Sequence, residues 1–533
     1  MGASYDVVVV GAGFSGLYML HRLRQAGETV RVYEAGPSVG GTWFWNRYPG
    51  ARVDIESQEY AYSFSPELDA EWTWTERYAA QPELLGYLNH VADRFDLRRD
   101  IQLETRVTSA VWDEAARRWN VTTNRGDRVS ARHVVMATGC LSVPKDDAEL
   151  PGSETFRGDS WRTGRWPAGG VDFTGKTVAV IGTGSSAIQA IPKIAEQATR
   201  VTVFQRTPNF SVPAHNGPVD PAVVADWDAN REQYRKEARD TGFGIRYIGA
   251  SETPALSVSD DARQAEYEER WRYGGFALLG AYADLVMDPA ANATAAEFVR
   301  GKIAEIVKDP KTAEKLAPKT YPIGAKRICV DTGYYAAFNR DNVSLVDLTE
   351  EPIERVTPAG VKTAVGHYEV DAIVYAIGFD AMTGALDKID IRGRGGERLR
   401  DAWAAGPGTY LGLLVAGFPN LFLVTGPGSP SVLCNMAVAI EQHVEWISDC
   451  IAWMSERRAG SIEATPDAQD AWVAHVNEVA EATIFPLANS WYLGANVPGK
   501  PRVFMPYIGG FPIYRDKCNE VAAAGYDGCL VRA

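Results

Sequence analysis

The sequence predicts an α/β fold made of two Rossmann-like units and a helical insertion. Two buried-strand patterns, residues 5–10 and 176–181, each run directly into a glycine-rich turn, residues 11–16 and 182–187. Apolar residues at helical spacing and a further strand follow each turn, which is the order of a βαβ unit. Between residues 217 and 318, Asp, Glu, Arg and Ala dominate and apolar residues recur at helical spacing, so we expect helices there.

The composition is that of a globular protein without nucleic-acid partners. The chain has 533 residues, enough for two to four domains, of which 46% are hydrophobic and 23% are charged. Its net charge is −14 and it has no long basic run, which argues against binding to nucleic acid. The six cysteines include no pair at two-residue spacing, so we expect neither a metal site nor a redox dithiol.

The apolar stretch from Val7 to Leu20 is the segment most similar to a leader or a membrane span. It follows Asp6 rather than a basic segment, three glycines interrupt it, and it is shorter than a spanning helix. We therefore expect a cytoplasmic protein without stable membrane association, present as a monomer or a weak homo-oligomer.

The first glycine turn carries the features of a dinucleotide-binding fingerprint. Gly11 permits the tight turn, Gly13 lets backbone N–H groups approach a pyrophosphate, and Gly16 lets helix and strand pack closely. The next strand, residues 29–33, ends in Glu34, which suits ribose hydroxyls and repels a 2′-phosphate. FAD or NAD is therefore favoured over NADP; the alternative is a glycine turn that only joins two packed elements.

The second glycine turn differs from the first where its following strand ends. Its third glycine is replaced by Ala187, which the motif tolerates, and the strand Arg200 to Phe204 leads to Gln205, Arg206 and Thr207. An arginine at this place suits a 2′-phosphate, so NADPH is the expected second nucleotide. The alternative is that Arg206 is a solvated surface charge.

Three other segments are read from their composition. Residues 40–54 are dense in aromatics and glycine and suit a loop folded over a flat ring, although their tryptophans could instead be core. Residues 156–167 have no clean period and are expected to be a surface loop between the two units. The strand Asp371 to Tyr375 leads to Ala376-Ile377-Gly378, which echoes Ala137-Thr138-Gly139 and marks the return to the first unit.

We expect the domains to comprise residues 1–142 with 373–533 for FAD, 143–215 with 322–372 for NADP, and 216–321 for the helical insertion.

Two nucleotide sites of opposite ribose chemistry imply hydride transfer from NADPH to FAD. A disulfide reductase is disfavoured because no CxxC is present, which leaves O₂ as the electron acceptor. A flavin peroxide survives only in a dry, preorganised and cationic pocket, for which arginine is the appropriate cation.

The chain resembles the Baeyer–Villiger monooxygenases, flavoproteins that insert oxygen beside a ketone to give an ester or lactone. The resemblance covers nearly the whole length, and its linker, with Phe156, Gly158, Arg162 and Trp166, ends in Trp-Pro as in this family rather than as in the N- and S-oxygenating flavin monooxygenases. Further shared segments are residues 11–16, 40–54, 182–187, 324–327, 338–343 and 491–502.

The resemblance implies roles for individual residues. Arg327 would stabilise the peroxyflavin anion and then the adduct with the substrate carbonyl, and Asp54 would pair with Arg327 and orient it. Arg206, Thr207 and Lys326 would hold the 2′-phosphate. The full set implied to bind cofactor is Gly11, Gly13, Ser15, Gly16, Glu34, Thr42, Trp43, Asp54, Tyr60, Val107, Gly182, Thr183, Gly184, Ser185, Ser186, Gln189, Arg206, Thr207, Lys326, Met436 and Trp491.

The expected substrate is a small apolar ketone, with thioether sulfoxidation as a second activity. The apolar, uncharged side chains expected to line the pocket are Cys140, Leu141, Ser431, Val432, Leu433 and Cys434. Two departures from the family pattern bear on coupling: Arg162 stands at the linker's histidine position, and Ile377 replaces a threonine. The alternatives are an uncoupled NADPH oxidase or reductase, an N- or S-oxygenating enzyme, and a cofactor-binding protein without chemistry.

Overall fold

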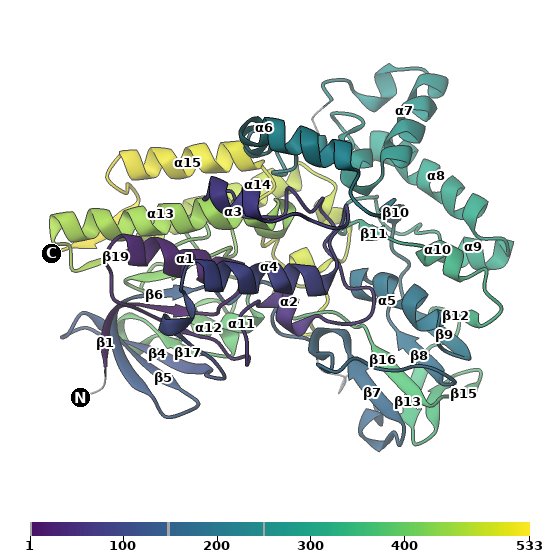
Figure 1. The fold of residues 1–533 in the computed structure, drawn as a ribbon, viewed down its shortest axis with the longest axis horizontal. Coiled ribbons are helices and arrows are strands. Elements are labelled where there is room, and N and C mark those ends of the chain that lie inside the picture. Colours follow the sequence, from purple (N-terminus) through teal and green to yellow (C-terminus); the bar gives the residue numbers. More distant parts are fainter. Residues whose placement is uncertain (1–2, 146–149, 249–250) are drawn as a thin grey trace.

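The two units predicted from the glycine turns form two separate sheets that lie side by side (Figure 1). The computed structural model describes residues 3–145, 150–248 and 251–533. In the view of Figure 1 the first sheet lies at the left, the second at the lower right, and the helical insertion at the upper right. The predicted α/β fold with two Rossmann-like domains and a helical insertion is therefore confirmed.

The first sheet has eight strands, with a parallel part around β1 and an antiparallel meander beside it. Its order is β17-β4-β5-β6-β1-β2-β3, with β18 also pairing with β6. β1 pairs in parallel with β2 and β6, so the strand before the first glycine turn is central in the sheet. The bounds are β1 Ser4–Val10, β2 Val30–Tyr33, β3 Ile101–Gln102, β4 Val107–Asp113, β5 Arg118–Thr123, β6 Arg128–Met136, β17 Asp390–Arg392 and β18 Leu421–Leu423.

The second sheet is wholly parallel, in the order β12-β9-β8-β16-β7. Its edge strand β7 lies within residues 156–167, which were expected to form a surface loop, and that expectation is wrong. β7 pairs in register with β16, more than 200 residues later in the chain, and no local pattern could have indicated this pairing. The bounds are β7 Asp159–Arg162, β8 Thr177–Ile181, β9 Arg200–Gln205, β12 Val343–Asp347 and β16 Ala372–Tyr375.

The expected domain boundary at residue 373 falls inside β16, which belongs to the second sheet. The chain therefore leaves the second unit after Tyr375.

The described residues also form three smaller sheets: β10 with β11, β13-β14-β15 in that order, and β19 with β20. Their bounds are β10 Ser211–Pro213, β11 Cys329–Asp331, β13 Ile353–Thr357, β14 Gly360–Thr363, β15 His367–Glu369, β19 Ser461–Ala464 and β20 Cys529–Arg532.

The helices cover both units, and α6 to α9 make up the insertion (Figure 1). α1 packs between the first sheet and α13, because its leucines and aromatic residues are fully buried. Residues 42–45 form the short helix α2, so the aromatic segment expected to be a loop begins as a helix. The bounds are α1 Phe14–Gln25, α2 Thr42–Trp45, α3 Pro66–Glu71, α4 Gln81–Arg94, α5 Ser185–Ala195, α6 Pro221–Arg239, α7 Asp260–Tyr273, α8 Pro289–Ile306, α9 Pro310–Leu316, α10 Tyr334–Ala337, α11 Gly384–Asp387, α12 Leu399–Ala402, α13 Met436–Arg457, α14 Pro466–Glu481 and α15 Phe511–Ala523.

Candidate functional site

The first glycine turn joins β1 to α1 by a very close backbone approach. A Cβ atom built on Gly16 would lie 1.8 Å from the Gly11 carbonyl oxygen, so only glycine fits at residue 16. The Glu34 carboxylate, at the end of β2, accepts hydrogen bonds from the backbone N–H of Ala12 (2.8 Å) and of Gly36 (2.7 Å). Burial raises the pKa of Glu34 above its ordinary value, while these two donors oppose the rise. Glu34 thus holds the first turn through both oxygens of its carboxylate.

The second glycine turn repeats this backbone path but is more open. Gly182 has φ of +111°, and a Cβ on it would meet the Ala376 carbonyl oxygen at 2.4 Å. A Cβ on Gly184, in contrast, would have no heavy atom within 4 Å. Thr183 donates from its hydroxyl to the Thr207 carbonyl at 2.9 Å, which fixes the end of β9 against the turn.

Both turns leave a helix N-terminus free for an anionic group. α1 begins after Gly13 and α5 after Gly184, with no side-chain cap and no acidic residue in the first turn. Helices of the insertion are different, because α6 and α8 are capped by the carboxylates of Asp220 and Asp288. Uncapped N–H groups and the helix dipole favour phosphate binding, so the residues present fit two dinucleotides.

Two cations face each other beside the second turn. Arg206 follows β9 directly, is exposed, and has no hydrogen bond or ion pair with any described residue. The Lys326 ammonium lies 4.5 Å from the centroid of the Tyr321 ring. Burial lowers the pKa of Lys326 and the charge of Arg206 lowers it further, so an anion between them would relieve their repulsion.

Arg327 is held at the junction of the two units by three hydrogen bonds. Its Nε and Nη2 atoms donate to the two oxygens of Asp54 at 2.7 and 3.0 Å, and its Nη1 donates to the Val432 carbonyl at 2.6 Å. About a quarter of each side chain of the Arg327–Asp54 pair remains exposed. Burial alone would lower the pKa of Arg327, but the adjacent Asp54 carboxylate raises it above its ordinary value.

An apolar cluster that contains Val432 lies beside this ion pair, because Arg327 donates to the Val432 carbonyl. It combines Cys140 and Val432 with Met382 and Phe504, and Leu141 and Leu433 pack against it. The sequence pointed to four of these six residues, whereas Met382 and Phe504 come from segments that only the fold brings together. The arrangement is a fixed cation beside an apolar surface, which suits the stabilisation of developing negative charge on a neutral substrate.

This chain is similar to oxygenating flavoenzymes over almost its full length. A family model described as pyridine nucleotide-disulphide oxidoreductase matches residues 8–236. A Baeyer-Villiger monooxygenase from Pseudooceanicola batsensis and phenazine N-monooxygenase PhzNO1 from Lysobacter antibioticus are each 43% identical, over 99% of this chain and 97% of the relative. A solved structure of an oxidized steroid monooxygenase bound to NADP is 55% identical and superposes with a TM-score of 0.95, over 99% of this chain and 100% of that one.

The chain belongs to the Baeyer–Villiger monooxygenases. Arg327 and Asp54, which the resemblance pairs, do lie together in this member of the family. Arg206 and Lys326 also lie close enough to repel each other. Thr163 of the linker accepts a hydrogen bond from Ser186 of the second turn at 3.0 Å.

The aromatic segment of this monooxygenase reaches across to the second unit through Gln189. The Gln189 side chain accepts from the Tyr48 hydroxyl at 2.8 Å and donates to the Arg52 carbonyl at 3.1 Å. Its amide therefore docks residues 48–52 on α5, a role that the fingerprint spacing did not indicate. Trp43 is buried and packs edge-on against Tyr60, with ring centroids 5.9 Å apart.

Other residues implied to bind cofactor are spread around the two turns. Thr42 is exposed at the start of α2, Met436 is half-buried at the start of α13, and Trp491 is half-buried in the 3₁₀ segment Trp491–Leu493. Val107, at the start of β4, is buried in the cluster that also contains Tyr33. Ser15 is buried on α1, and the Ser185 hydroxyl contacts the Cys329 sulfur at 3.4 Å.

The linker is anchored in the second unit. Trp166 is buried and packs against Trp161 and Phe173, with centroid distances of 6.0 and 6.2 Å. A Cβ on Gly158 would lie 2.3 Å from the Asp371 carbonyl oxygen. Phe156 packs against the apolar cluster on the strands of the second sheet. Arg162, which replaces the family histidine, is the half-buried last residue of β7.

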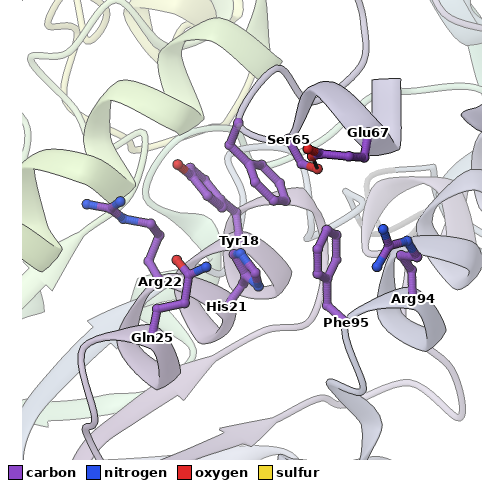
Figure 2. Close-up of a pocket in the computed structure, with 9 residues that line it drawn as sticks. Tyr18, His21, Arg22, Gln25, Ser65, Glu67, Arg94 and Phe95 are labelled. Carbon is purple, nitrogen blue, oxygen red and sulfur yellow. Dashed lines mark hydrogen bonds between the residues drawn. The ribbon is translucent and has the colours of Figure 1, made fainter. Parts of the chain in front are cut away.

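A hollow of about 270 Å³ on the first unit is separate from these residues (Figure 2). Residues of α1 and of the end of α4 line it, and Tyr18 and Phe64 of its lining stack with ring centroids 4.3 Å apart. The arginines at its two ends are engaged, Arg22 by Asp449 and Arg94 by Glu71. No expected site residue lines it.

Two further findings concern metal ions and membranes. Among the described residues, no cluster of His, Cys, Asp and Glu is arranged to hold a metal ion. Within the same part of the chain, no helix is long and apolar enough to cross a membrane.

Proposed function

We propose that Arg327, oriented by Asp54, is the catalytic cation of an FAD- and NADPH-dependent enzyme that converts ketones to esters or lactones. The observation that carries the proposal is the bidentate ion pair between Arg327 and Asp54. A third hydrogen bond joins Arg327 to the Val432 carbonyl. Family membership supplies the reaction class, and the ion pair supplies the residue.

The first glycine turn would hold FAD and the second NADPH. Glu34 favours an unphosphorylated ribose, whereas the pair of Arg206 and Lys326 favours a 2′-phosphate. When bound, the flavin supplies hydride acceptance from NADPH and activation of O₂. Gln189 would hold the two halves in register through residues 48–52.

Arg327 would stabilise negative charge on the substrate, and the apolar cluster around Val432 would exclude water. The Arg327 guanidinium cannot lose its proton, so it presents a constant positive charge to negative charge that develops on the substrate carbonyl oxygen. Asp54 and the Val432 carbonyl fix its plane, which removes reorganisation at the moment of reaction. The apolar cluster around Val432 excludes water and strengthens that field.

The substrate class that fits is a neutral, apolar ketone. Cys140, Leu141, Val432 and Leu433 carry no charge, and one relative with a solved structure is a steroid monooxygenase. A second candidate activity is oxygenation of a nitrogen or thioether sulfur, favoured by the phenazine N-monooxygenase at 43% identity. The same fixed cation and apolar surface would serve both substrate classes.

The experiment is to follow NADPH, O₂ and hydrogen peroxide with and without each member of a panel of cyclic ketones, steroids, thioethers and N-heteroaromatics. A ketone oxygenase forms ester in proportion to NADPH consumed and releases less peroxide when ketone is present. An uncoupled oxidase releases peroxide regardless of ketone, and a protein without chemistry consumes no NADPH. Turnover of charged acids or amines alone would contradict the proposed substrate class.

A further inference from the structure

The segment that carries Trp491 has little regular structure of its own, so other contacts must hold it. After the single 3₁₀ turn Trp491–Leu493, the described residues up to Gly510 contain no helix or strand. Tyr492 is 1% exposed, and its side chain contacts the Arg327 guanidinium. Burial raises the pKa of Tyr492 to about 12, although Arg327 opposes the rise, so Tyr492 stays neutral. The position of this segment therefore bears directly on Arg327.

Lys500 anchors the far end of the segment. Its ammonium donates to Asp380 Oδ1 at 2.6 Å and to the Ala381 carbonyl at 2.7 Å, and its side chain is only 10% exposed. Asn496 adds a hydrogen bond to the Phe379 carbonyl at 2.8 Å. A lysine buried to this extent needs its partners, because an unpaired buried charge is strongly unfavourable.

Of the two residues that Lys500 contacts, Ala381 belongs with Met382 to the apolar cluster beside Arg327, and Asp380 precedes it in the chain. The backbone N–H of Asp380 donates to the Val143 carbonyl and that of Met382 to the Cys140 carbonyl, both at 2.8 Å. Met382 has φ of +65°, in the left-handed region that non-glycine residues rarely adopt, and is 4% exposed. Neighbouring hydrogen bonds must hold this conformation, and Lys500 supplies one of them to Ala381.

We propose that Lys500 is a positioning residue: its ion pair with Asp380 sets the segment Trp491–Leu493 against Arg327 and fixes Met382 in the apolar cluster. The inference rests on the proposed function and on the family resemblance, which implies that Trp491 binds cofactor. Loss of the ion pair then weakens the retention of NADP⁺ and lowers kcat for large ketones. FAD binding, which involves other elements, is unchanged.

The test compares Lys500→Met, Lys500→Arg and Asp380→Asn with the matched control Lys302→Met. Lys302 forms a comparable ion pair with Glu268, at 2.8 Å, and is 14% exposed, but it lies in the insertion on α8. The readouts are the dissociation constant of NADP⁺ by fluorescence titration, chymotryptic cleavage after Trp491 and Tyr492, the FAD content, and KM and kcat for a bulky and a small ketone.

We expect Lys500→Met to bind NADP⁺ roughly tenfold more weakly, in line with the loss of one charge-assisted contact. We also expect faster cleavage after Trp491 and a lower kcat for the bulky ketone. Lys500→Arg should retain most of the affinity, because it keeps the charge. The double variant Lys500→Met, Asp380→Asn should be no weaker than Lys500→Met, because one change already breaks the pair.

Parental NADP⁺ affinity and cleavage in Lys500→Met, or an equal loss in Lys302→Met, would overturn the proposal. If Lys500→Met does not fold, the same comparison is made with Asp380→Asn and Lys500→Arg, where parental affinity in Asp380→Asn is equally contradictory. Failure of the unaltered protein to bind NADP⁺ would instead remove the proposed function on which the inference rests.

Discussion

Gly16 and Ala187 occupy the same place in the two glycine turns, yet only one of them can carry a Cβ. In the first turn a Cβ on residue 16 would overlap the Gly11 carbonyl oxygen, whereas the second turn accommodates the real Cβ of a fully buried Ala187. The strands that follow also end differently: the first in the buried Glu34, bound to backbone N–H groups, and the second in the exposed Arg206, which has no ion pair with any described residue. The same backbone turn is thus tight in the first unit and open and cationic in the second.

The largest effect is expected from Gly16→Ala. The overlap at 1.8 Å forces the turn to shift, which costs about 1–3 kcal/mol or more and moves the N–H groups that face the pyrophosphate. We expect the variant to be purified largely without FAD and to unfold at a lower temperature. Ala187→Gly is the control, since it should cost only about 0.5–1 kcal/mol and keep FAD. Full FAD content in Gly16→Ala would show that the two turns are equally tolerant.

A more local effect, on nucleotide binding and not on folding, should follow Arg206→Ala. Loss of one charge-assisted contact to a 2′-phosphate costs about 1.5–3 kcal/mol, so KM for NADPH should rise roughly ten- to a hundredfold while KM for NADH barely changes. Arg200→Ala supplies the control, because Arg200 is also exposed but begins β9 rather than following it. Equal use of NADPH and NADH by the unaltered protein would contradict the claim that the cationic second turn selects a 2′-phosphate.

The smallest effect concerns acid stability of the first unit. Burial lowers the pKa of His133, on β6, to about 3, and neither ring nitrogen has a hydrogen-bond partner among the described residues. The unfolded chain takes up a proton below about pH 6.5 and the folded one does not, so stability is lost as the pH falls through this range. Between pH 7.5 and pH 5.5, His133 should lower the free energy of unfolding by about 1.4 kcal/mol.

Urea unfolding of the parent and of His133→Leu at both pH values measures this difference. The variant should gain stability relative to the parent at pH 5.5 by the stated amount. His367→Leu is the control, because His367 is exposed on β15 in the region of the second unit. A stability difference between parent and His133→Leu that is the same at both pH values would contradict the explanation.

The features that the sequence predicted correctly are those encoded within a few residues. Each glycine turn lies between its own strand and helix, so its local pattern was sufficient, and the pairing of Arg327 with Asp54 followed from the family resemblance. Strand β7 was missed because its partner β16 is distant in the chain. Met382 and Phe504 were missed for the same reason, since only the fold brings them to Val432.

Gln189 illustrates a subtler limit of local patterns. The family resemblance implies that Gln189 binds cofactor, and in the structure its amide also bonds to Tyr48 and Arg52 of the other unit. A fingerprint predicts where a ligand lies and does not show which side chains the protein uses to join its own domains.

The formation of ester by Arg327→Ala tests the central claim most directly. The variant is loaded with FAD, reduced with NADPH, and mixed with O₂ and a ketone that the parent converts. We predict that FAD content and reduction by NADPH stay near parental values while ester or lactone is absent, because loss of a preorganised charge at a developing oxyanion costs several kcal/mol. Ester formation at the parental rate would mean that Arg327 is only a structural partner of Asp54 and would contradict the account.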